Sequence, residues 1–157
     1  MKKIACLLLI LCILPACAFG DTLAEVYDRF AMYSELCGAP ELPDGANRID
    51  KGSFYMVEYR VSDSLISGFM ETGNDISGGY VICVDPASQG DFLALCVAHV
   101  YTVCGTSDAL DAYTPLLDGF LEVRKGNAQE DVTVGNMIFS FFPMKSGLAF
   151  NYSIIKK

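Results

Sequence analysis

The chain has 157 residues, of which 52% are hydrophobic and 19% are charged, so it has enough apolar material to fold around a core and is not disordered. At this length one core is expected rather than two. The formal net charge is −8, with 19 acidic residues against 11 basic ones. That excess of acid disfavours binding to nucleic acid and to anionic lipid surfaces, because both require Lys and Arg to meet phosphate.

Residues 1–20 have the three parts of an export signal. Lys2 and Lys3 precede an apolar run, and small residues follow up to Gly20. The run covers 11 residues, whereas a helix needs about 20 to cross a bilayer. We therefore expect a cleaved signal peptide, no membrane span, and a mature domain over residues 21–157 that is periplasmic, on the cell surface or secreted.

A lipid anchor at Cys17 is the alternative for the mature N-terminus. The preceding Leu14-Pro15-Ala16 resembles the processing box of a bacterial lipoprotein. Pro15 fits that box poorly, so ordinary signal cleavage is the favoured expectation.

The mature chain is expected to begin with a helix over residues 22–37. Thr22 and Glu25 have the spacing of a capping box, and apolar residues then recur at helical intervals. Gly38 is typical of a helix C-terminus. The stretch 39–52 has no periodicity and is expected to be a surface loop.

Alternating apolar residues predict a strand over 53–61, a second over 65–72, and a third that ends near Val84. Short polar turns separate the three segments. Consecutive strands with short turns are expected to pair in an antiparallel sheet.

A helix is predicted over residues 91–104, with an apolar arc so wide that most of its surface must be enclosed. Gly105 is expected to end it. A second helical stretch follows and ends near Gly126. Pro115 is expected to begin a new helix there, because proline lacks the N–H that a helix interior uses.

The C-terminal segment is expected to form a hairpin around a turn at residues 145–147, with alternating apolar residues on both sides. The predicted order is therefore α-β-β-β-α-α-β-β. We expect a single α+β domain with an antiparallel sheet of about five strands and helices packed against it.

Four cysteines follow the export signal, at Cys37, Cys83, Cys96 and Cys104. Cys96 and Cys104 lie about 12 Å apart along one predicted helix, too far for a disulfide. Pairing of Cys37 with Cys104 and of Cys83 with Cys96 is the preferred arrangement for an exported chain. Four buried thiols are the alternative.

His99 is the one histidine of the chain. With Cys96 three residues before it, it has the spacing of a thiolate–imidazole pair that could act as a nucleophile. It falls inside the apolar arc, however, which favours a buried neutral imidazole. The scattered cysteines and single histidine lack zinc-ligand spacing, so we expect no metal, no cofactor and no catalytic residue.

A second apolar sheet face emerges if Tyr55 and its alternating neighbours pack on the helices. Phe54 and Met56 would then face away, as would Ile138 and Phe142 near the C-terminus. Such residues need cover. Either the first helix supplies it, or the four residues form a binding surface for a partner or a ligand.

These observations favour an exported non-catalytic binding or interaction protein of the bacterial cell envelope, of the accessory or inhibitor type. Its partner would be another protein or a small apolar ligand. The alternatives are a small thiol-dependent enzyme using Cys96 and His99, and a carrier that holds an apolar small molecule between sheet and helices.

Overall fold

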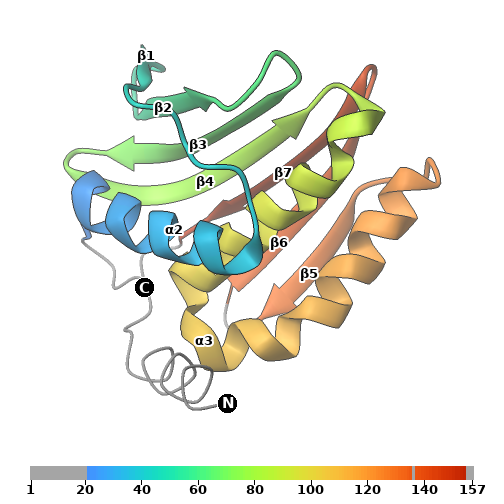
Figure 1. Ribbon diagram of the computed structural model, residues 1–157. Coiled ribbons are helices and arrows are strands. Elements are labelled where there is room, and N and C mark those ends of the chain that lie inside the picture. The colour runs from blue at the N-terminus through green and yellow to red at the C-terminus, as the bar shows by residue number, and fades with distance from the viewer. Residues whose placement is uncertain (1–20, 136, 155–157) are drawn as a thin grey trace.

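The computed structural model describes residues 21–135 and 137–154, which form an α+β fold (Figure 1). The predicted export signal and Cys17 lie outside the described residues. The helices of the described part are α2 (Leu23–Cys37), the 3₁₀ turn η1 (Pro86–Ser88) and α3 (Gln89–Arg124). The strands are β1 (Asn47–Asp50), β2 (Tyr55–Arg60), β3 (Leu65–Thr72), β4 (Asp75–Cys83), β5 (Glu130–Val134), β6 (Met137–Met144) and β7 (Gly147–Ser153).

The seven strands form one antiparallel sheet in the order β1-β2-β3-β4-β7-β6-β5. The sheet consists of two meanders, one of β1 to β4 and one of β5 to β7. Helix α3 connects them, and the pairing of β4 with β7 joins them edge to edge.

The capping box predicted at the first helix is confirmed. The Thr22 amide donates to Glu25 Oε2 at 2.8 Å, and the Glu25 amide donates to Thr22 Oγ1 at 3.4 Å. Gly38 ends α2 in the left-handed conformation, with φ of 65°. Asp21 connects the start of the helix to β4, because its carbonyl oxygen accepts a hydrogen bond from the Ile76 amide at 3.0 Å.

The sheet has two more strands than the five predicted from sequence. Strand β1 lies in the stretch expected to be a loop, and it has no apolar alternation. It pairs with β2 through its backbone, and Arg48 bonds Glu71 at 2.8 Å while lying 4.1 Å over the ring of Tyr55. Strand β5 is fixed by Val132 and Val134, which are buried beneath α3. Strand β1 is therefore decided by tertiary contacts and not by local pattern.

Helix α3 bends where the sequence predicts and continues where it predicts a break. Gly105 has φ of 73° and ψ of 179°, values that interrupt the helix. The break expected at Pro115 is wrong, because the helix runs through that residue. Pro115 lies on the exposed side, while Ala112, Leu116 and Phe120 keep helical spacing on the buried side. Their burial offsets a proline cost of about 3 kcal/mol.

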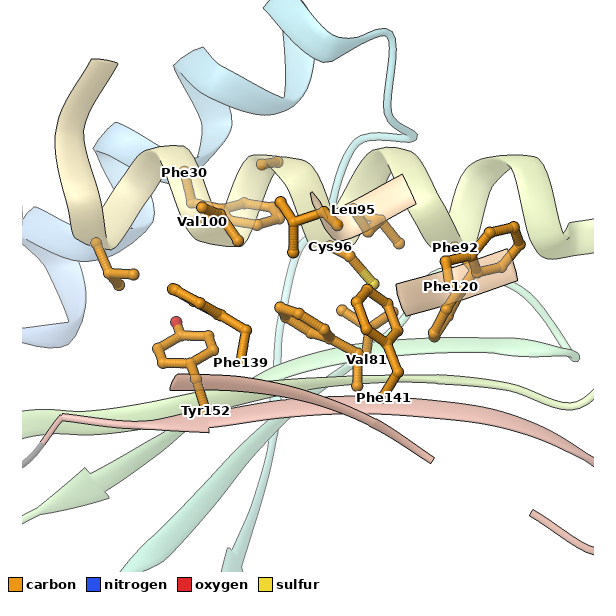
Figure 2. Packing of buried hydrophobic residues seen from close by; sticks show 14 of the residues in the cluster. Phe30, Val81, Phe92, Leu95, Cys96, Val100, Phe120, Phe139, Phe141 and Tyr152 are labelled. Carbon is orange, nitrogen blue, oxygen red and sulfur yellow. The ribbon is translucent and has the colours of Figure 1, made fainter. Parts of the chain in front are cut away.

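The core lies between the two long helices and one face of the sheet. Figure 2 shows Phe139, Phe141 and Tyr152 pointing from the sheet toward α3, with Phe30 of α2 beside them. The rings of Phe139 and Phe150 stack with centroids 5.8 Å apart. Both helices therefore occupy the same face, and no helix of the described residues covers the other (Figure 1).

Candidate functional site

Alternation along the strands decides which side chains meet the helices. Val57, Tyr59, Phe69 and Val81 are buried on the helix side. Their neighbours point to the opposite side. We call that opposite surface the open face, formed by Ile49, Met56, Glu58, Arg60, Ile66, Met70, Tyr80, Ile82, Ile138, Ser140, Phe142, Ala149 and Asn151.

Strand register arranges the open face in rows that cross the strands. One row runs from Arg60 through Ile66, Ile82 and Ala149 to Phe142. Its four apolar members are half-buried. Its apolar members form a continuous band across the four strands β3, β4, β7 and β6, with no helix of the described chain above it.

A second apolar row lies on the same face, formed by Ile49, Met56 and Met70. Methionine side chains adapt their shape to a partner, which makes them frequent at binding surfaces. Between the two apolar rows runs a polar one, whose members in strand order are Asn47, Glu58, Gly68, Tyr80, Asn151, Ser140 and Asp131.

Tyr80 supplies the one aromatic ring of this polar row. Its ring covers Gly68 on the neighbouring strand, where an added Cβ would lie 2.6 Å from the tyrosine Cζ. The side chain is only 5% exposed although it stands on the face without a helix. Burial raises the pKa of Tyr80, and its hydroxyl has no hydrogen-bond partner among the described residues.

Three of the four predicted surface residues lie on the open face. Met56 and Phe142 belong to its apolar rows, and Ile138 on β6 is 52% exposed. The suggestion that the first helix covers them is wrong, since α2 packs on the other side. Phe54 lies instead in the turn before β2, where its carbonyl accepts the Lys51 amide.

Sequence reasoning missed the centre of this surface. Ile66, Met70, Tyr80 and Ile82 occupy alternate positions of the two middle strands. The same alternation that singled out Met56 was present in those segments. The alternation in these two strands is less evident because glycine and serine, which have low strand propensity, lie between the apolar residues.

Charge is sparse on the open face. In the three rows the charged side chains are Glu58, Arg60 and Asp131. Asp131 stands near the β5 edge, where Gln129 and Ser140 donate hydrogen bonds to it and hold the pKa of its carboxyl below the usual value. The middle of the surface is therefore neutral in a chain whose net charge is −8.

No family model, curated protein or solved structure matches the chain.

The Cys96–His99 pair considered as an alternative does not form in the structure, where His99 is buried as the sequence favours. His99 Nε2 lies 3.0 Å from Ser67 Oγ, and His99 Nδ1 lies 3.1 Å from the Tyr152 hydroxyl. The rings of Phe30 and Phe69 lie within 4.7 and 5.0 Å of the imidazole. Burial lowers the pKa of His99 to about 3, so the ring is neutral.

Burial raises the pKa of three thiols, those of Cys37, Cys83 and Cys96, which disfavours their nucleophilic thiolate forms. Burial raises the pKa of Cys96 well above its usual value, with a contribution from nearby Cys83. Cys83 donates to the Asp85 carbonyl at 3.1 Å and is also buried. Burial raises the pKa of Cys37 to about 11. Cys104 is half-buried. The two predicted disulfides remain predictions.

Alkylation of Cys37, Cys83 and Cys96 in the reduced, folded protein should therefore be slow. Cys83 and Cys96 are expected to be protected until unfolding, since the reagent cannot reach them. Cys37 should carry about a hundredfold less thiolate than a cysteine with the ordinary pKa of 9.0. Mass spectrometry after iodoacetamide, with and without denaturant, measures both effects. Rapid labelling of Cys96 in the folded protein would restore the thiol-enzyme hypothesis.

Two surface hollows lie on the helix side of the molecule. One, of about 500 Å³, lies beside α2 and includes Glu35, Glu41 and Asp44 in its lining. The other, of about 330 Å³, is lined by uncharged side chains, with Tyr101 and Tyr113 among them. Neither lies between sheet and helices, where a carrier was expected to hold its ligand and where aromatic rings fill the core.

Further site classes find no support in the part of the chain that the structure describes. Over residues 21–135 and 137–154, no cluster of three His, Cys, Asp or Glu side chains is placed to hold a metal ion. Across the same ranges, no helix combines the length and apolar character needed to cross a membrane.

Proposed function

We propose that this chain is an exported, non-catalytic interaction protein that binds a protein partner through its open face. The observation that carries the proposal is the pair of apolar rows on a sheet face without a helix above it. The export signal predicted from the sequence puts the interaction in a bacterial cell envelope or outside the cell.

The composition of the face supports a protein partner. It presents Ile, Met, Phe and Tyr side chains with few charges, as the centres of protein interfaces do. Contiguous apolar surface of this kind is rare on monomeric proteins and commonly marks a contact site. Ile138 at 52% and Met144 at 38% exposure extend the apolar surface along β6.

The interior supports a structural role for the groups that an enzyme would use. Ser67, His99 and Tyr152 form a hydrogen-bonded chain, yet each is at most 1% exposed. A substrate could not reach the imidazole without unfolding the core. The hydrogen bonds among Ser67, His99 and Tyr152 are better explained as a satisfied buried network that fixes the packing of α3 on the sheet.

A photoreactive benzoylphenylalanine at Phe142 tests the proposal in the exporting cell. Phe142 is half-buried on the open face, so its replacement should capture any protein that covers the surface. The matched control carries the same group at Leu36, which is 40% exposed on α2. We expect a covalent adduct at position 142 and none at position 36.

The mass of the adduct identifies the type of partner. Twice the mass of the chain would indicate a second copy, and any other mass would indicate a different protein. Absence of an adduct at position 142, or equal adducts at both positions, would contradict the proposal.

A further inference from the structure

We infer that the occupant of the open face is a second copy of this chain, which forms a two-fold symmetric dimer by packing sheet on sheet. The inference rests on the proposed function and names its partner. Three observations support it: the size of the face, its charge pattern, and the match of that pattern to a two-fold axis between two copies.

The size of the open face matches what a dimer needs. Seven strands spaced about 4.8 Å apart span roughly 29 Å, and strands of this length extend roughly 22 Å. The projected area is therefore roughly 650 Å², before the relief of the side chains is added. A standard interface buries about 800 Å² on each partner.

Charge explains why two copies would meet at this face and not at another. The chain has 19 acidic residues against 11 basic ones, so copies repel one another over most of their surfaces. The middle of the open face is neutral. On β2 the face has one acid, Glu58, and one base, Arg60, in adjacent rows.

A two-fold axis can bring the acid of one copy opposite the base of the other, so that Glu58 and Arg60 form complementary pairs across the interface. An axis that crosses the strands between the row of Tyr80 and the row of Ile82 exchanges the two rows between copies. Glu58 then faces the partner's Arg60, and Arg60 faces the partner's Glu58. The same axis lays the Tyr80 ring over the partner's Ile82. Sheets stacked with nearly aligned strands, at about 30°, are a common packing.

A charge exchange at Glu58 and Arg60 tests this geometry. The exported, processed chain would be studied by sedimentation velocity and light scattering over a range of concentrations. We expect a dimer whose dissociation constant rises about tenfold or more in Glu58→Arg and in Arg60→Glu, because each change places like charges together twice. The double variant E58R/R60E should return to within about threefold of the wild type.

Two further variants separate the interface from the fold. Ile82→Asp should abolish the dimer, while Leu36→Glu on the helix side should leave it unchanged. Circular dichroism checks that each variant is folded, and the exchange at exposed Arg60 keeps the test valid if Ile82→Asp unfolds.

Different results overturn different claims. A chain that stays monomeric, but whose position 142 captures another protein, overturns the dimer and leaves the proposed function standing. A dimer that ignores both single charge changes overturns the assignment of the open face as its interface. A monomer without any adduct at position 142 overturns both.

Discussion

Replacing His99 with glutamine is expected to remove most of the loss of stability that the folded chain suffers in acid. The unfolded chain binds a proton at His99 near pH 6.5, whereas burial lowers the pKa to about 3 in the folded state. The free energy of unfolding therefore has its full value, with respect to His99, above pH 6.5. It falls as the pH drops from 6.5 toward 3. The slope reaches about 1.4 kcal/mol per pH unit, and the total loss is about 5 kcal/mol. Small domains have only about 5–15 kcal/mol in all.

Urea unfolding of the wild type and of His99→Gln at pH 7, 6, 5 and 4 measures the effect. Glutamine can donate and accept hydrogen bonds toward Ser67 and Tyr152 but takes up no proton. Exposed carboxylates such as Glu25 and Glu122 have lowered pKa values, so their protonation in acid also destabilises the folded protein. This effect is the same in the wild type and in the variant. Parallel stability curves would contradict the buried neutral imidazole.

The fold could be predicted from sequence where local chemistry decides it. The Thr22 capping box, the turn of Gly38 and the interruption at Gly105 depend on residues within a few positions, and each is confirmed. Strand β1 depends instead on a distant contact, that of Arg48 with Glu71. Helix continuity at Pro115 depends on burial of the neighbouring apolar face. Both were therefore hidden from a reading of the sequence alone.

The open face could be predicted only in part, for the same reason. Alternation placed Met56, Ile138 and Phe142 on the second side of the sheet, and the structure agrees. Sequence could not tell which side the first helix would cover. It also could not show that Ile66 and Ile82 stand in line with Phe142, because that alignment needs the order β3-β4-β7-β6. Strand order, not strand pattern, makes the residues one surface.

A methyl group at Gly147 is expected to destabilise the fold strongly, because the added atom would overlap the backbone of the neighbouring strand. An added Cβ would lie 1.9 Å from the Cys83 carbonyl oxygen and 2.8 Å from the Val84 Cα. Both are backbone atoms, so no rotamer change relieves the overlap and β7 must separate from β4. We expect Gly147→Ala to cost about 3 kcal/mol or more in free energy of unfolding.

Gly90→Ala is the matched control, because nothing lies within 4 Å of the added atom in the first turn of α3. It should be neutral or stabilise by up to about 1 kcal/mol. Denaturant unfolding of both variants at pH 7 gives the comparison, and equal stabilities would refute the close approach of β7 to β4. This pairing joins the two meanders and holds Ile82 beside Ala149. Gly147→Ala should therefore also separate Ile82 from Ala149 on the open face. We expect it to weaken binding of the partner even though no side chain of the open face is changed.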